Sequence, residues 1–329
     1  MKNAKPIRSV APPSETIRID AARERYTRER EKPAAINAFA NAVMERDPAH
    51  ALHLLEKGLA ITPRSASLLT TKLSVICGMN DASTMAAVLD ELETLEQPAP
   101  YWVERMIEGR REGFFEVGYG VRLPYDPELI SPWIARYLAL GNYESQEATI
   151  LAEHLDPADR VLDLGAGLGL MGCIVGKTMP PAVYRGYEAN PELAPLIERT
   201  KALNDLDLDI RSGAVGRQDG TATFHIDERF WSSSFTARET TIRSVSVPVV
   251  DFAAMLKEFS PTFLVMDIEG AEYDILDYSN WKSVRKVLVE THPHKVADER
   301  HRAGLMALFK RGFLPSGQSS KGRVLYLYR

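Results

Sequence analysis

Residues 161–169 read Val-Leu-Asp-Leu-Gly-Ala-Gly-Leu-Gly and stand between an apolar run and a helical pattern. Gly165 and Gly167 permit a tight turn and let a ligand approach the backbone, because a side chain at either position would collide with it. Gly169 opens the predicted helix, whose free N–H groups can face a polar ligand. The segment therefore predicts a strand, a ligand-binding turn and a helix in succession.

Three features distinguish this turn from a loop that only reverses the chain. Asp163 lies two residues before the first glycine, where a carboxylate can hold the ammonium group of a methionine moiety. Leu170 stands where the dinucleotide fingerprint would have its last glycine. Glu188 ends the next predicted strand, a position from which a carboxylate would hydrogen-bond two ribose hydroxyls. Together they favour a nucleotide-type ligand that is not a dinucleotide.

The sequence after residue 156 alternates short β-rich runs with helical patterns. Such alternation predicts a doubly wound α/β fold, a mostly parallel sheet with helices on both faces. The last strand follows a glycine- and proline-containing turn, so we expect it to return antiparallel. The predicted domain spans residues 146–329, with strands at residues 160–164, 183–187, 208–211, 221–226, 245–250, 262–267, 286–290 and 324–328.

A second acidic segment follows the predicted strand at residues 262–267. Asp267 and Glu269 stand two residues apart at the mouth of this strand, beside a glycine that begins a helix. Ligands in such sheets bind outside the carboxyl ends of the strands, so both side chains are expected in the same crevice as Asp163 and Glu188. Helix capping is the alternative. We assign it fully to Glu272 and only in part to Asp267 and Glu269.

The strand at residues 286–290 ends on Glu290, and His292 and His294 follow it. A carboxylate and two imidazoles at the carboxyl end of a strand are a natural place for a general base. A single histidine more often has a structural role. A metal shared with Asp267 would need ligands that converge in space, which a sequence does not display, so no metal site is assigned.

The residues before 146 predict three segments. Residues 1–20 carry three prolines among polar residues and are expected to be disordered. Residues 21–98 have helical apolar spacing throughout, and two of the helices close on Pro63 and Pro98, a period close to the ~34 residues of a tetratricopeptide repeat. Residues 99–145 form a connection whose aromatic side chains are expected to pack between the two domains.

Composition narrows the class of protein. The chain has 329 residues and a net charge of -5, which gives no general attraction to nucleic acid or to an anionic membrane surface. It contains no apolar run near the ~18 residues of a membrane span and no apolar signal core. Cys77 and Cys173 stand far apart in apolar surroundings, as in a reducing compartment. We therefore expect a cytoplasmic protein.

From about residue 141 to residue 290 the sequence resembles the FkbM-type methyltransferases. The segments that carry this resemblance come in the order of the family, and Asp-x-Glu-Gly-Ala-Glu is the most specific of them. They are Tyr143-Glu144, the segment 161–169, Tyr187-Glu188-Ala189-Asn190-Pro191, Gly213-Ala214-Val215-Gly216, Ser232-Ser233-Ser234-Phe235, Val247-Pro248-Val249-Val250-Asp251 and Asp267-Ile268-Glu269-Gly270-Ala271-Glu272.

The resemblance implies a Rossmann-like class I methyltransferase domain that uses S-adenosylmethionine. The acceptor would usually be a hydroxyl on a sugar, glycan or natural product, although some relatives methylate nitrogen on a peptide or small molecule. Cofactor-binding residues are then expected at Glu144, Asp163, Gly165, Gly167, Glu188, Ala189, Gly213, Ala214 and Asp267. The helical unit lies outside the family pattern and could roof the acceptor site, dock a carrier or partner protein, or mediate dimerisation.

Methyl transfer is an in-line displacement, so alignment is the main task of the enzyme, and an aliphatic hydroxyl also needs a base. We expect His292 to be that base, oriented by Glu290 or Glu269, and the loop of residues 230–234 to close over the acceptor. A nicotinamide oxidoreductase is disfavoured by Leu170, and a nucleobase methyltransferase by the missing Asn/Asp-Pro-Pro motif. The alternative from another class is a helical-repeat adaptor with a degenerate enzyme domain, which the intact motifs disfavour.

Overall fold

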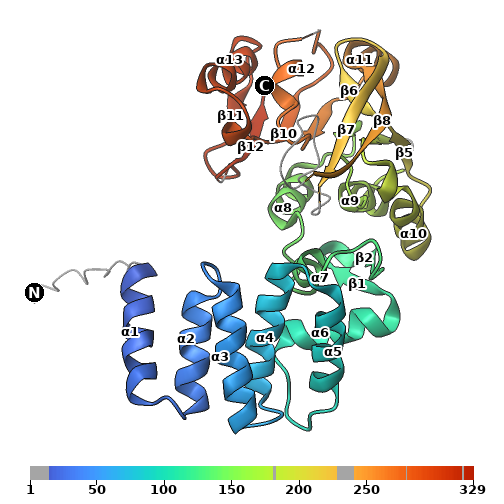
Figure 1. The fold of residues 1–329 in the computed structure, drawn as a ribbon. Helices are drawn as coiled ribbons and strands as arrows, with labels where there is room; N and C mark the ends of the chain where they lie inside the picture. Colours follow the sequence, from blue (N-terminus) through green and yellow to red (C-terminus); the bar gives the residue numbers. More distant parts are fainter. Residues whose placement is uncertain (1–14, 181–182, 228–240, 279, 321) are drawn as a thin grey trace, which may run out of the picture. The chain divides into compact units, whose positions relative to one another are not determined.

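The computed structural model describes residues 15–180, 183–227, 241–278, 280–320 and 322–329 (Figure 1). The chain divides into two compact units, one comprising residues up to 111 together with 130–139, the other residues 112–129 together with 140–329. The segment 99–145, predicted to be a connection, is thus shared between the units. The loop of residues 230–234, predicted to cover an acceptor, lies outside the described residues.

The first unit is helical, and each helix from α1 to α5 packs against the next one. Its helices are α1 (Glu15–Arg28), α2 (Pro33–Val43), α3 (Pro48–Ile61), α4 (Ala66–Met79), α5 (Ala82–Glu93), α6 (Tyr101–Glu112) and α7 (Pro132–Ala139). Prolines begin α2 and α3, and the Asp47 and Asp81 side chains cap α3 and α5 by accepting backbone hydrogen bonds.

Helix α1 begins at Glu15, inside the stretch predicted to be disordered. Ile19 is buried and, with Tyr26, packs against the core of α2 and α3 around Ile36 and Leu55. This burial offsets the entropy of ordering the helix, which the proline-rich composition of the preceding residues does not reveal. Helix α7 also belongs to this unit. It packs against α4, although the two helices are far apart in the sequence.

The second unit contains a seven-stranded sheet with the order β11-β12-β10-β9-β3-β4-β5. Pairing is parallel from β10 through β5 and antiparallel where β12 meets β10 and β11. This confirms the predicted Rossmann-like fold with an antiparallel last strand. The strands are β3 (Val161–Leu164), β4 (Tyr184–Glu188), β5 (Asp209–Ser212), β9 (Phe263–Met266), β10 (Lys286–Glu290), β11 (Leu314–Pro315) and β12 (Val324–Tyr328).

Helices cover both faces of this sheet, so its central strands are buried throughout. Leu162, Leu164 and Met266 face the core built with α11, α12 and α13, whereas α8 and α9 pack on the opposite face. The helices of this unit are α8 (Ser145–His154), α9 (Leu170–Thr178), α10 (Ala194–Asn204), α11 (Phe252–Phe259), α12 (Glu272–Ile275) and α13 (Asp298–Lys310).

Two predicted strands do not join the main sheet. Strands β7 (Gly220–Asp227) and β8 (Thr241–Asp251) pair antiparallel and form a separate three-stranded sheet with β6 (Ala214–Gly216). Their side chains have a small core of their own around Phe224 and Val247. A further hairpin, β1 (Phe114–Val117) with β2 (Val121–Pro124), also belongs to this unit.

Among the residues that the structure describes, no helix is long and apolar enough to cross a membrane.

The buried side chains of the helical unit allow a stability prediction. Leu55 is fully buried in α3, so we expect Leu55→Ala to lower the free energy of unfolding by about 2–5 kcal/mol through lost burial and a residual cavity. Ile61→Ala is the matched control, because Ile61 ends the same helix and is 48% exposed. Its expected change is below about 0.5 kcal/mol. Urea denaturation measures both, and equal losses would contradict the core assignment.

Candidate functional site

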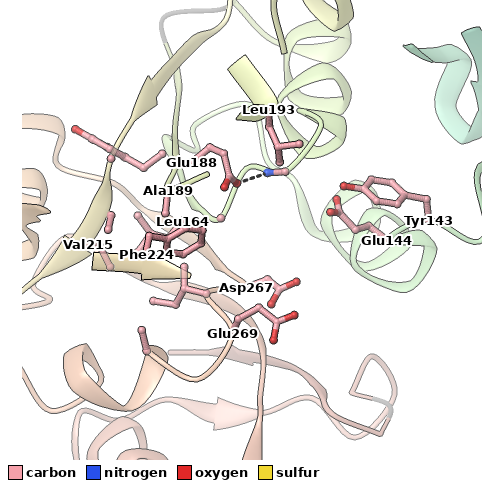
Figure 2. A pocket seen from close by; sticks show the side chains of 17 residues that line it. Tyr143, Glu144, Leu164, Glu188, Ala189, Leu193, Val215, Phe224, Asp267 and Glu269 are labelled. Carbon is pink, nitrogen blue, oxygen red and sulfur yellow. Dashed lines mark hydrogen bonds between the residues drawn. The ribbon is translucent and has the colours of Figure 1, made fainter. Parts of the chain in front are cut away.

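A pocket opens where the carboxyl ends of β3, β4 and β9 meet (Figure 2). Ligands of doubly wound sheets bind at this edge. The structure brings to its wall all but one of the residues predicted to bind a cofactor, and Glu269 with them. They are Glu144, Gly165, Gly167, Glu188, Ala189, Gly213, Ala214 and Asp267.

The glycine turn forms the wall of this pocket and cannot carry side chains. Gly165 has φ +88, and a Cβ atom there would fall on the backbone oxygen of Asp267. The N–H groups of Gly165 and Ala166 both donate to the oxygen of Tyr187, at 2.9 and 3.0 Å. Asp267 N donates to Leu164 O at 2.9 Å. The turn is thus tied to both neighbouring strand ends, which leaves no room for a side chain at position 165.

Glu188 reaches from the end of β4 to the same turn. Its Oε2 accepts from Gly167 N at 2.9 Å, and its Oε1 accepts from Asn190 N at 2.7 Å. Burial raises the pKa of Glu188 to about 7, although these two hydrogen bonds act in the opposite direction. Each oxygen retains acceptor capacity, so the carboxylate can bind a pair of hydroxyl groups.

Glu144 approaches the pocket from the segment before α8. Figure 2 shows its carboxylate directed toward the pocket, beside Tyr143. The backbone of Glu144 is left-handed, with φ 44, and the Tyr143 hydroxyl accepts from Leu168 N at 3.4 Å. Burial holds the pKa of Glu144 well above its usual range, and the charges of nearby carboxylates act in the same direction. A cationic ligand would relieve this unfavourable arrangement.

Asp163 does not line the pocket, in contrast to its predicted role. Successive side chains of a strand alternate between faces, and Leu164 faces the pocket while Asp163 points toward α9. It is buried and accepts a 2.7 Å hydrogen bond from the Tyr184 hydroxyl, and burial raises its pKa to about 6. Tyr184 fits there because Gly172 of α9 has no side chain to meet its ring. Asp163 thus supports the turn from behind.

Glu272 organises the acidic loop after β9. It is fully buried, and its oxygens accept from Ile268 N at 3.2 Å and Gly270 N at 2.9 Å. The loop needs this support because both Glu269 (φ 56) and Gly270 (φ 106) are left-handed. The sequence analysis predicts only a helix-capping role for Glu272. In the structure, the Glu272 carboxylate also contacts His292.

His292 is buried, and its two ring nitrogens face different acids. Its Nδ1 lies 3.0 Å from Glu272 Oε1, a contact that the sequence did not predict. Its Nε2 is directed at three carboxylates, 3.4 Å from Glu269, 3.8 Å from Asp267 and 3.9 Å from Glu290. His292 itself stands behind the pocket wall. A base there would act through, or beside, Glu269.

Two cations adjoin this acidic group. Lys295 pairs with Glu269, and Arg323 lies 2.9 Å from Glu290. Burial holds the pKa of Asp267 well above its usual range, and the negative charges of Glu290 and Glu272 add to the effect. His294, the second histidine of the predicted base site, is exposed and its ring lies 5.9 Å from that of His292.

Comparison with known proteins gives a family for the second unit. Residues 181–315 match the methyltransferase FkbM domain. Methyltransferase sdnD of Sordaria araneosa is 23% identical over 220 residues, which cover 50% of this chain and 82% of sdnD.

Two solved structures are also similar. Precorrin-6y C5,15-methyltransferase from Geobacter metallireducens GS-15 has 12% identity and a TM-score of 0.31, covering 56% of this chain and 85% of that one. The mitomycin 7-O-methyltransferase MmcR has 16% identity and a TM-score of 0.32, covering 95% of this chain and 98% of that one.

The glycine turn gives the first prediction for this site. Gly165→Ala would require left-handed backbone and force the turn away from Asp267, so we expect a loss of more than about 1 kcal/mol in the free energy of unfolding. Gly317→Ala is the control, because no atom lies within 4 Å of its added Cβ. Chemical denaturation of both variants compares them, and a loss no larger than that of the control would contradict the close approach.

Glu188 gives a pH prediction. Because the folded-state pKa of Glu188 is raised to about 7, the folded protein takes up a proton as pH falls through 7, while the unfolded chain does so near its ordinary value of 4.5. Its contribution to stability is therefore present at low pH and lost as pH rises through 7. We expect Glu188→Gln to flatten the pH dependence of the unfolding free energy between pH 5 and 8.

Urea denaturation across this range measures the slope. Exposed Glu128 supplies the matched control: Glu128→Gln should leave the slope as in the wild type. A wild-type slope in Glu188→Gln would contradict the raised pKa.

The glycine turn, the acids at its edge and the family match all indicate the same class of enzyme. Residues 181–315 match the methyltransferase FkbM domain, and the chain is an S-adenosylmethionine-dependent methyltransferase.

Proposed function

We propose that this enzyme methylates a hydroxyl group on a sugar, glycan or other natural product, free or bound to a carrier. The observation that carries the proposal is the acidic wall of the pocket, where Glu269 lines the cavity and His292 stands behind it at 3.4 Å. An aliphatic hydroxyl must lose its proton as it attacks, whereas an amine already has a lone pair. A cluster of acids with an imidazole can take up such a proton and therefore suits a hydroxyl acceptor better than an amine.

The cofactor fits the described residues. The backbone of Gly165 and Gly167 lines the pocket, a Cβ atom at Gly167 would stand against the Tyr143 hydroxyl and the Glu144 carboxylate, and the buried Glu188 carboxylate can accept from ribose hydroxyls. Glu144 and Asp267 would offset the positive charge of the methionine part. We propose that the remaining predicted positions, Ala189, Gly213 and Ala214, contact the cofactor as part of the pocket wall. Asp163 would support the glycine turn from the side away from the pocket, through its hydrogen bond with Tyr184.

S-adenosylmethionine supplies an electrophilic methyl group, so this chain contributes alignment and proton removal. As the acceptor oxygen bonds to the methyl carbon, the carbon–sulfur bond breaks and the hydroxyl proton passes to the cluster of His292, Glu269 and Glu290. Glu272 accepts from His292 Nδ1 and so directs Nε2 toward the pocket side. It also stabilises a positive charge on the ring.

The atom that is methylated tests the proposal directly. With cofactor carrying a ¹³C-labelled methyl group, we expect sugars or polyhydroxylated natural products to yield an O-methyl carbon by nuclear magnetic resonance. Amino sugars and peptides offered in parallel test the alternative, N-methylation of a peptide or small molecule. A product carrying label only on nitrogen would contradict the proposal.

The role of His292 is tested by substitution. We expect His292→Ala to reduce turnover by about 10²- to 10⁴-fold, the usual contribution of a general base. Cofactor affinity measured by calorimetry should stay near wild type, because His292 does not line the pocket. His53→Ala, on an exposed position of α3, is the control. Undiminished turnover in His292→Ala would remove it from the mechanism.

A further inference from the structure

The side chains of Asp267, Glu269 and His292 converge, although they come from two loops at neighbouring strand ends. One ligand atom from each, two carboxylate oxygens and an imidazole nitrogen, lies within 4.8 Å of the other two. Figure 2 shows the carboxylates of Asp267 and Glu269 side by side and directed the same way. Two carboxylates and one imidazole are a donor set for a divalent transition-metal ion such as Mn²⁺.

Asp267 is the member whose polar atom lacks a partner. Its Oδ1 is buried and accepts no hydrogen bond from any residue in the described part of the chain. It lies 3.8 Å from His292 Nε2. Leaving a buried acceptor unsatisfied is costly, so such an atom usually marks a missing ion or water.

The orientation of His292 is that of a metal ligand. Histidines that bind metals usually donate their other ring N–H to a carboxylate, which fixes the tautomer. Glu272, itself fully buried, occupies this position at 3.0 Å from Nδ1. When Nδ1 carries the proton, the lone pair of Nε2 faces the oxygens of Asp267, Glu269 and Glu290, and a cation between them would relieve the repulsion.

Acidic groups outnumber the cations of this cluster. Four carboxyl groups, those of Asp267, Glu269, Glu272 and Glu290, surround His292, and the cations beside them are Lys295 on Glu269 and Arg323 on Glu290. A divalent cation would favour the ionised form of these acids, and Lys295 would then be displaced from Glu269.

We propose that Asp267, Glu269 and His292 bind one divalent cation at the acceptor side of the pocket, with Mn²⁺ as the probe that detects it. The inference rests on the proposed function for its catalytic consequence alone. A hydroxyl bound to the cation is more acidic. Because Glu269 and His292 are then held as ligands, Glu290 is the member of the proposed proton-accepting cluster that takes the proton, as the oxygen bonds to the methyl carbon and the carbon–sulfur bond breaks.

Titration of the full-length enzyme with Mn²⁺ alone, followed by the electron paramagnetic resonance of free Mn²⁺, tests the site. We expect saturable binding of one ion per chain and nitrogen modulation of its spin echo. Glu269→Gln should weaken binding by about tenfold or more, and Glu272→Gln by about 10- to 100-fold through the freed imidazole. His292→Gln should remove the nitrogen modulation.

Two further variants sharpen the test. Lys295→Met should tighten Mn²⁺ binding, because it removes the cation that competes for Glu269. Glu299→Gln, at an exposed position of α13, should bind as the wild type does. Circular dichroism and cofactor calorimetry establish that each variant is folded. Absence of saturable binding, or wild-type binding by folded Glu269→Gln, would overturn the cation site.

Failure of the cation site and failure of the proposed function give different results. Full hydroxyl methylation after chelation, without Mn²⁺ binding, would overturn the cation site and leave the proposed function standing. Mn²⁺ binding of the expected pattern, with label only on nitrogen, would support the site and overturn the proposed acceptor.

Discussion

The close approach of two backbone turns is the constraint on which the site depends. Gly165 directly follows β3, and Asp267 directly follows the neighbouring strand β9. The backbones of these two residues are so close that a Cβ atom on Gly165 would overlap the backbone oxygen of Asp267. Hydrogen bonds from Gly165 to Tyr187 and from Asp267 to Leu164 hold these strand ends in register. Because Gly165 and Gly167 have no Cβ atom, their backbone itself lines the pocket, and a ligand can lie against it.

Burial of acids is the second organising feature of this domain. Asp163 and Glu188 are buried and Glu144 and Asp267 are half-buried, and burial raises the pKa of all four. Burying carboxylates costs free energy, which positive charge brought by a ligand partly returns. A sulfonium and an ammonium group would supply that charge. The pocket is therefore matched electrostatically to the cofactor that the family uses.

Glu272 connects the two halves of the acceptor side. One carboxylate stabilises a left-handed loop through Ile268 and Gly270 and also fixes His292 on the next strand end. The acidic loop and the histidine are thus positioned by one buried group, and neither can move alone. This contact brings together two groups that lie 20 residues apart in the sequence.

Local patterns in the sequence determined the glycine turn, the alternation of strands and helices, and the acids at the strand ends, because each depends on neighbouring residues or on the period of a strand. Tertiary structure decided the rest. Strand pleating, not position, turned Asp163 behind the turn toward Tyr184. Pairing separated β7 and β8 from the main sheet, and long-range packing placed α7 with the first helices. The contact of Glu272 with His292 spans a helix and a strand, and no local period encodes such a contact.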